Sequence, residues 1–438
     1  MGAIFGVMGS VSGAELDEMG RRLVHRGEHV TWHQVANCVY LGQVAAKRLS
    51  PFFDSRFAMA IDAADALVPD AYDRVLHSFR RSQDARDLDQ SLRMPFALAA
   101  WDAADQQLWL CRDFLGLKPL HYCVLPSGGI AFATEYKALL AIDEIPARPD
   151  LEAIRSLQMF KAMPVGRTML AGIWPVPPGT VLRLSPNGMQ SLDTMPRIRL
   201  AVSPMSEGQA VDQLRQRLEN ATAPLVAGRK RIGIALSGGI DSMSVAFLAR
   251  KCAPEEELVG FTTGESPDDP EVRRAALVMA SLGGQHEPMV VANEELLSKL
   301  PMAVWHLENP IGRSETFQYL SLARKAREHG FDSLLTGMGA DLLFGGMPRH
   351  KVLWLAERMP LLSKDLLGFF ESTQTGEPSS RPLARLMTAL YYRGAVPRAP
   401  AVMNCDTASA PELIAAAGPE FINRGLMLDG PEPTSRPR

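Results

Sequence analysis

Leu236-Ser237-Gly238-Gly239-Ile240-Asp241-Ser242 is the stretch that decides how the C-terminal half of this chain folds. The stretch begins at the last residue of an apolar run, residues 232–236, which is typical of a buried parallel strand. A helix is expected to begin near the last residue of the stretch, Ser242. The two glycines let the backbone approach an anion closely, and successive N–H groups together with the positive end of the helix attract it. The two serine hydroxyls are further donors. The stretch therefore predicts a phosphate-binding loop, the alternative being a tight turn in which Ser and Asp cap the helix.

Asp241 is the unexpected residue of this loop, because a carboxylate repels phosphate unless a metal ion lies between them. The sequence therefore predicts Mg²⁺ between Asp241 and a polyphosphate. A second glycine-rich segment, residues 336–346, follows a predicted strand and carries Asp341. Ligands of doubly wound sheets bind along the carboxyl edge that such strands share, so we expect Asp341 beside Asp241 as a second metal ligand. Taken alone, Asp341 is equally compatible with a helix cap.

The remaining pattern predicts two domains. Strands and helices alternate from residue 205 onwards, which is typical of an α/β doubly wound parallel-sheet domain over 205–438. Its helices are expected at 207–226, 270–282, 316–328 and 349–370, and its strands at 232–236, 258–262 and 333–336. Residues 1–198 predict an α+β sandwich, with short strands at 4–7, 38–41, 96–100, 108–111, 130–133 and 180–184 and helices near 14–24 and 72–82.

The composition excludes several classes of protein. The 438 residues include 46 Lys and Arg against 49 Asp and Glu, a net charge of −3 that gives no electrostatic support for a nucleic-acid partner. Five cysteines without a CxxC pair argue against a disulfide framework or a structural zinc site. No apolar stretch reaches the ~18 residues of a membrane helix, and the N-terminus lacks the pattern of a signal peptide. We therefore expect a cytoplasmic protein with no membrane partner.

The motifs resemble those of the asparagine-synthetase superfamily. Residues 237–242 are similar to its SGGxDS pyrophosphate loop, residues 336–346 resemble its second signature, and residues 308–310 resemble its substrate segment. These matches imply a PP-loop synthetase domain. The N-terminal half resembles the Ntn-like class II glutamine amidotransferase domain of the same family through His25-Arg26-Gly27, Lys47-Arg48-Leu49-Ser50, residues 112–120, residues 133–139 and Pro177-Pro178-Gly179.

The resemblance implies an ATP- and Mg²⁺-dependent ligase. In this superfamily a substrate carboxylate attacks the α-phosphate of ATP and releases pyrophosphate, and an amine then takes the acyl group and releases AMP. The implied catalytic residues are Asp241, Asp341, Glu308 and Lys351, and the implied Mg²⁺ ligands are the two aspartates. The implied nucleotide contacts are Leu236, Ser237, Gly238, Gly239, Asp241, Ser242, Thr262 and Gly337.

The chain also departs from the family pattern. The family's amidotransferase nucleophile is a cysteine after the initiator Met, but here that position is Gly2, and the Asn-Gly-Glu oxyanion segment is missing around residues 60–66. Without a thiol no acyl-enzyme forms, so we expect a scaffold without glutaminase activity. Met338 stands where the family places a polar residue near the nucleophile, which leaves Glu308 or His350 as general base. The candidates for a cation that steadies pyrophosphate are Lys351, Lys364, Arg385 and Arg393.

Three functions remain open from the sequence. The favoured one is an AMP-forming ligase that joins or cyclises a small-molecule or peptide carboxylate, similar to β-lactam synthetases and lasso-peptide cyclases. The alternatives are an asparagine synthetase variant fed by free ammonia and a nucleotide-binding subunit that has lost its chemistry. A homodimer or a complex with a partner subunit is compatible with all three.

Overall fold

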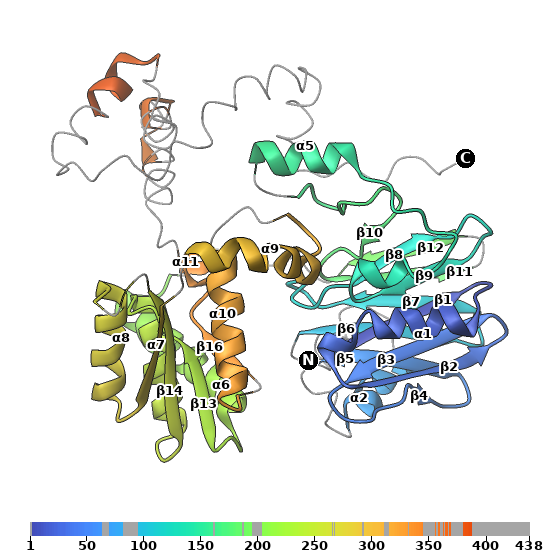
Figure 1. The fold of residues 1–438 in the computed structure, drawn as a ribbon, viewed down its shortest axis with the longest axis horizontal. Helices are drawn as coiled ribbons and strands as arrows, with labels where there is room; N and C mark the ends of the chain where they lie inside the picture. Colours follow the sequence, from blue (N-terminus) through green and yellow to red (C-terminus); the bar gives the residue numbers. More distant parts are fainter. Residues whose placement is uncertain are drawn as a thin grey trace. The chain divides into compact units, whose positions relative to one another are not determined.

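The structure of this chain is a computed structural model (Figure 1). It describes residues 2–63, 70–81, 95–160, 163–185, 188–194, 204–264, 266, 268–290, 293–310, 315–331 and 333–344, together with single residues and short pieces between 355 and 387. The chain divides into two compact units, and the boundary lies between Ala201 and Val202. Each unit has hydrophobic clusters of its own.

The first unit contains, in its described part, two antiparallel six-stranded sheets. The first sheet has the order β10-β8-β9-β1-β3-β2 and comprises β1 (Ala3–Met8), β2 (His29–Ala36), β3 (Val39–Ala45), β8 (His121–Val124), β9 (Ile130–Ala133) and β10 (Trp174–Pro175). The second has the order β12-β11-β7-β6-β5-β4 and comprises β4 (Phe52–Phe53), β5 (Phe57–Ala63), β6 (Phe96–Asp102), β7 (Gln107–Arg112), β11 (Thr180–Ser185) and β12 (Gly188–Thr194).

The alternation of side chains along β1 explains how these sheets stack. Phe5 points into a cluster with Met19 of α1 (Gly13–Arg21), whereas Ile4 belongs to the cluster shared with Leu110 of the second sheet. Successive side chains of a strand face opposite sides, so β1 is buried on both faces. The outer face of the second sheet is covered by α2 (Asp70–Arg81), through residues such as Val75. The result is a sandwich of two sheets between helices, as the N-terminal sequence pattern predicted.

Short helices complete the first unit. They are η1 (Val24–Arg26), α4 (Tyr136–Leu139) and α5 (Leu151–Phe160). The start of α1 has a capping box, in which Ser12 and Glu15 satisfy each other's backbone N–H groups.

The second unit contains a parallel sheet of the order β15-β14-β13-β16. Its strands are β13 (Arg231–Ala235), β14 (Glu257–Gly264), β15 (Gln285–Val290) and β16 (Leu334–Thr336). Its helices are α6 (Glu207–Val226), α7 (Ile240–Cys252), α8 (Pro270–Ser281), α9 (Asn293–Leu307), α10 (Glu315–Glu328) and α11 (Ala340–Phe344). The predicted parallel α/β arrangement is confirmed, and the helix expected at 349–370 lies mostly outside the described residues.

The strand order fixes where a ligand would bind. From β13 the chain adds β14 and then β15 on one side, and returns to add β16 on the other. The order therefore reverses at β13, and the loops that follow β13 and β16 leave adjacent strand ends. Open parallel sheets bind ligands at such a switch point, outside the carboxyl ends of the strands.

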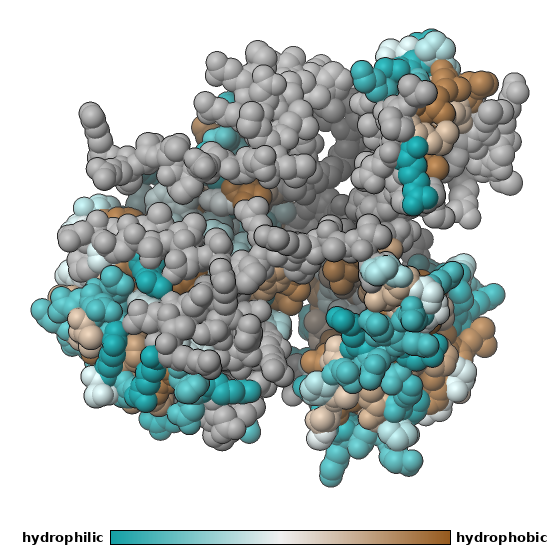
Figure 2. Space-filling model, turned by 180° about the vertical axis from the view of Figure 1, so that it is seen from behind, coloured by the Kyte–Doolittle hydropathy of each residue, from teal (hydrophilic) through white to brown (hydrophobic). Residues whose placement is uncertain are grey.

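The described surface is mostly hydrophilic on the face drawn in Figure 2, where hydrophobic residues occur in small groups. Among the helices that the structure describes, none combines the length and the apolar character needed to cross a bilayer.

Candidate active site

The loop after β13 has the conformation of an anion cradle. Leu236 is buried and its N–H donates to the carbonyl of Phe261 on β14 (2.9 Å), which fixes the point where the loop leaves the sheet. Gly238 has a φ of +69°, a left-handed conformation that favours glycine. Ser242 closes the loop from inside: its Oγ accepts from the N–H of Ser237 (3.2 Å) and donates to the carbonyl of Gly239 (3.1 Å).

Several backbone N–H groups at this loop have no acceptor within the described part of the chain. They belong to Gly238, Ile240, Asp241 and Ser242, whereas the N–H of Met243 makes the first helical bond, to Gly239 (3.0 Å). The N-cap residue of α7 is Gly239, which has no side chain to satisfy them. Unpaired N–H groups at the positive end of a helix bind anions, so this geometry suits a phosphate group.

The loop after β16 packs directly on the first loop. Ala235 and Thr336 are partners in the parallel pairing of β13 with β16. A Cβ atom added to Gly337 would lie 2.6 Å from the carbonyl carbon of Asp241 and 2.7 Å from the nitrogen of Ser242. Gly337 is thus required by the close approach of two backbones, and the two sequence motifs meet as predicted.

The two predicted metal ligands follow these loops. Asp241 is the second residue of α7 and Asp341 lies in the first turn of α11, and both are half-buried. No group of three or more His, Cys, Asp or Glu residues in the described ranges forms a complete metal site. An ion held here would need further oxygen ligands, which suits Mg²⁺ because it is usually bound by one or two carboxylates together with phosphate oxygens and water.

Thr262 is buried and is joined to the loop by its side chain. Its hydroxyl donates to the carbonyl of Leu236 (2.6 Å), and only 1% of the residue is exposed. Nε2 of His286 lies 3.0 Å from the same hydroxyl and must donate to it, because the hydroxyl proton is already used. Burial lowers the pKa of His286, which favours the neutral ring. The side chain of Thr262 thus supports the loop, and the nucleotide contact expected at this residue stays a prediction; no sequence pattern indicated the histidine.

Gly2 is surrounded by charged groups at the start of β1. Its N–H donates to Oδ1 of Asp62 at the end of β5 (3.3 Å), and its carbonyl accepts from Arg26 (3.4 Å). The carboxylate of Asp62 is 1% exposed and pairs with Nζ of Lys118 (2.8 Å). A Cβ on Gly2 would lie 3.2 Å from the same oxygen. The group beside Gly2 is therefore the carboxylate of Asp62, which accepts hydrogen bonds but donates none.

Comparisons with known protein families find one matching domain in each unit. The family model described as asparagine synthase matches residues 213–414, and the one described as a glutamine amidotransferase domain matches residues 75–194. The chain therefore carries two domains that match those of the asparagine-synthetase superfamily. The loops after β13 and β16 both lie within the segment matched by the asparagine synthase model, and the segment matched by the amidotransferase model lies within the two-sheet unit.

The matched segment spans less than half the length of the curated relatives. A glutamine-hydrolysing asparagine synthetase of Bacillus subtilis is 30% identical over 256 residues, which cover 58% of this chain and 40% of the relative. The carboxyethyl-arginine β-lactam synthase of Streptomyces clavuligerus is 33% identical over 260 residues, 58% of this chain and 46% of the relative. A Mycobacterium tuberculosis protein named after the glutamine-hydrolysing asparagine synthetases is 32% identical over 265 residues, 59% of this chain and 40% of that protein.

The amidotransferase-like unit also holds a buried carboxylate with three basic neighbours. Glu135 lies 2.9 Å from Nε2 of His25 and 2.5 Å from Nε of Arg26, and it also pairs with Lys137. Burial alone would raise the pKa of Glu135, but the hydrogen bond from His25 and the charges of Arg26 and Lys137 lower it to about 2. Arg26, part of a family motif, is therefore held in an ion pair.

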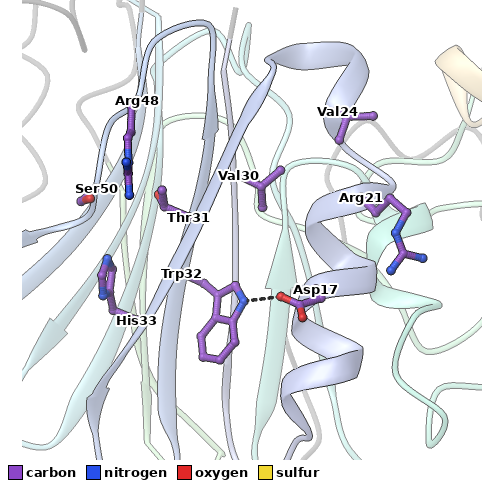
Figure 3. Close-up of a pocket in the computed structure, with 9 residues that line it drawn as sticks. All are labelled: Asp17, Arg21, Val24, Val30, Thr31, Trp32, His33, Arg48 and Ser50. Atoms are coloured by element: carbon purple, nitrogen blue, oxygen red, sulfur yellow. Dashed lines mark hydrogen bonds between the residues drawn. The ribbon is translucent and has the colours of Figure 1, made fainter.

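A surface cavity of this unit lies at the free edge of β2 (Figure 3). Figure 3 shows Thr31 and His33 on the side of Arg48, and Trp32 on the side of α1, where its Nε1 donates to Asp17 (2.8 Å). The cavity is lined by Asp17, Arg21, Val24, Val30, Thr31, Trp32, His33, Arg48 and Ser50, and includes neither Gly2 nor Asp62.

Glu308 and Lys351 are the other two predicted catalytic residues. Glu308 directly follows α9 in a left-handed conformation (φ +58°), and its N–H donates to Val304 (2.8 Å). Lys351 and the alternative base His350 lie outside the described residues. Met338 is 63% exposed, and its N–H donates to the hydroxyl of Thr336 (3.1 Å).

Proposed function

We propose that this chain is a Mg·ATP-dependent ligase that adenylates a substrate carboxylate, releases pyrophosphate and AMP, and forms an amide. The observation that carries the proposal is the row of unpaired N–H groups at the switch point, with the Asp341 loop packed against it through Gly337. Similarity to an asparagine synthetase and to a β-lactam synthase, both of which form amides, supports this activity.

The residues of the site have distinct tasks in this proposal. The unpaired amides of the loop, those of Gly238 and residues 240–242, bind phosphate oxygens and are already fixed, so they stabilise the charge that develops on departing pyrophosphate without reorganising. Asp241 and Asp341 would hold Mg²⁺. When bound, that ion neutralises charge on the triphosphate. Gly337 keeps the two loops at a fixed separation, which positions the reacting groups.

The amine is proposed to come from free ammonia or from the substrate itself. Gly2 has no thiol to attack glutamine, and the buried carboxylate of Asp62 beside it would repel an oxyanion instead of stabilising it. A ligase without its own ammonia supply is suited to closing an amide within one substrate, such as a specialised metabolite or a peptide that carries both carboxylate and amine.

Pyrophosphate release from Mg·ATP tests the proposal. The panel of acids includes aspartate with ammonia, N-carboxyalkyl amino acids and short peptides with a free amine. We expect release with at least one acid, and its loss in Asp241→Ala, because the substitution removes a metal-binding carboxylate. Asp212→Ala on α6 is the matched control, since its side chain is exposed and far along the chain from the loop.

Each outcome of this experiment is informative. Release that depends on aspartate and ammonia would identify an asparagine synthetase variant. Nucleotide binding without release over the whole panel would favour a subunit that has lost its chemistry. Unchanged turnover in Asp241→Ala would reject the assignment of the site.

A further inference from the structure

α8 brings a basic residue against the phosphate loop. A Cβ atom on Gly238 would lie 2.7 Å from Cβ of Arg274, 3.2 Å from the nitrogen of Ala275 and 3.3 Å from the carbonyl oxygen of Glu271. The backbone of Gly238 therefore rests on the second turn of α8. Ala275 is buried in the core cluster that includes Leu236, so this contact is anchored on its inner side. The side chain of Arg274 begins where the loop touches the helix.

The two neighbouring arginines of α8 have different surroundings. Arg273 donates from Nη2 to Oδ1 of Asp268 (2.6 Å) and so already has a charged partner. Arg274 has an exposed side chain and, within the described residues, neither an ion pair nor a hydrogen bond. Adjacent residues of a helix project about 100° apart, so the two side chains leave α8 in different directions. Arg274 is thus free to bind a ligand that sits on the loop.

We propose that Arg274 binds the pyrophosphate that leaves in the proposed reaction. The loop itself offers N–H donors with only the partial positive charge of a helix end, together with the carboxylate of Asp241, and neither carries a full positive charge. A guanidinium is always protonated and fits two phosphate oxygens at once, so it stabilises a pyrophosphate anion more strongly than neutral donors do. This inference rests on the proposed function, and it identifies a pyrophosphate-binding residue that the sequence motifs do not contain.

Binding of inorganic pyrophosphate in the presence of Mg²⁺, measured by calorimetry on the full chain, tests this role. We expect Arg274→Gln to weaken binding about ten- to a hundredfold, the range of charged hydrogen bonds, and Arg274→Lys to have a smaller effect. Binding of AMP, which lacks the departing phosphates, should not change. Arg273→Gln is the matched control on the same helix and should bind pyrophosphate like the wild type. Thermal unfolding of each variant verifies that the fold is intact.

The outcomes separate this inference from the proposed function. Wild-type pyrophosphate affinity in Arg274→Gln, or an equal loss in Arg273→Gln, would overturn the role of Arg274. If pyrophosphate binding depends on Arg274 but the wild-type protein releases no pyrophosphate from ATP with any acid, the ligase function alone would be overturned. Wild-type protein that does not bind pyrophosphate would overturn both.

Discussion

Gly337→Ala is the substitution that most directly tests whether the two loops form one site. The added methyl group would lie 2.6 Å from the carbonyl carbon of Asp241 and 2.9 Å from its oxygen, and these are backbone atoms that no change of rotamer can move. Overpacking of this kind costs about 1–3 kcal/mol. Because the strain falls on the N–H groups that are proposed to bind phosphate, we expect the affinity for Mg·ATP to fall by about tenfold or more, equivalent to ~1.4 kcal/mol.

Gly339→Ala is the matched control from the same turn. Gly339 has a φ of +92°, but nothing lies within 4 Å of its added Cβ. Alanine there strains the backbone by about 1–2 kcal/mol without pressing on the phosphate loop. Urea unfolding and ATP titration of both variants should therefore give similar losses of stability and a loss of affinity only in Gly337→Ala. Equal ATP affinities in the two variants would refute the reasoning that Gly337 sets the shape of the loop.

Four further predictions concern residues of the two units. Thr262→Val removes the donor to the buried carbonyl of Leu236 and should lower the free energy of unfolding by about 1–3 kcal/mol. The control Thr263→Val on the same strand should change it by less than about 0.5 kcal/mol, and equal effects in urea unfolding would contradict the supporting role of Thr262. Because burial lowers the pKa of His121 to about 4, its neutral form stabilises the first unit at neutral pH, and this stability should be lost as pH falls from 6.5 towards 4. The pKa of Glu135 is lowered from 4.5 to about 2, so its carboxylate contributes at most about 3 kcal/mol to the free energy of unfolding above pH 4.5, and this contribution should be lost as the pH falls from 4.5 to 2. Glu135→Gln should abolish only this acidic part of the pH dependence of unfolding. Gly2→Cys should release no glutamate from glutamine, because the carboxylate of Asp62 lies beside the new thiol and disfavours its thiolate. Glutamate detected in this variant by a coupled dehydrogenase assay would show that the carboxylate does not block the chemistry.

The sequence predicted the second unit well because its elements carry strong local signals. Residues 232–236 are apolar, and β13 is found at Arg231–Ala235; the helix expected at 207–226 is found as α6 with the same ends. The carboxyl-edge position of both glycine-rich loops followed from their place after strands. β15 and α9 were not predicted: β15 reads Gln-His-Glu-Pro-Met-Val, which lacks an apolar run, and α9 contains Pro301.

The candidate site was predicted in its motifs but not in its contacts. Glycine spacing indicated a loop that approaches an anion, yet it carried no information on what lies behind that loop. The bond from Thr262 to Leu236, the donor His286 and the contact of Gly238 with α8 all join residues that are distant in sequence, and only the strand order brings them together. The ion pair of Asp62 with Lys118 was likewise not indicated, because no pattern in a single sequence links positions 56 residues apart.

The candidate site is built from segments that are spread over the whole second unit. The phosphate loop, α8 and the loop of Gly337 come from three segments, and the chain completes β14, β15 and the helices between them before β16 can pair with β13. A ligand that binds the native loops but not the unfolded chain stabilises the unit by about 2.7 kcal/mol at a hundred times its dissociation constant. Because Gly238 rests on α8 and Gly337 rests on Asp241, we expect that stabilisation to extend to α8 and to the loop after β16 as well as to the loop itself. Slower amide hydrogen exchange in α8 when Mg·ATP is added would be the signature of this coupling, and protection confined to residues 236–243 would show that the loop binds alone.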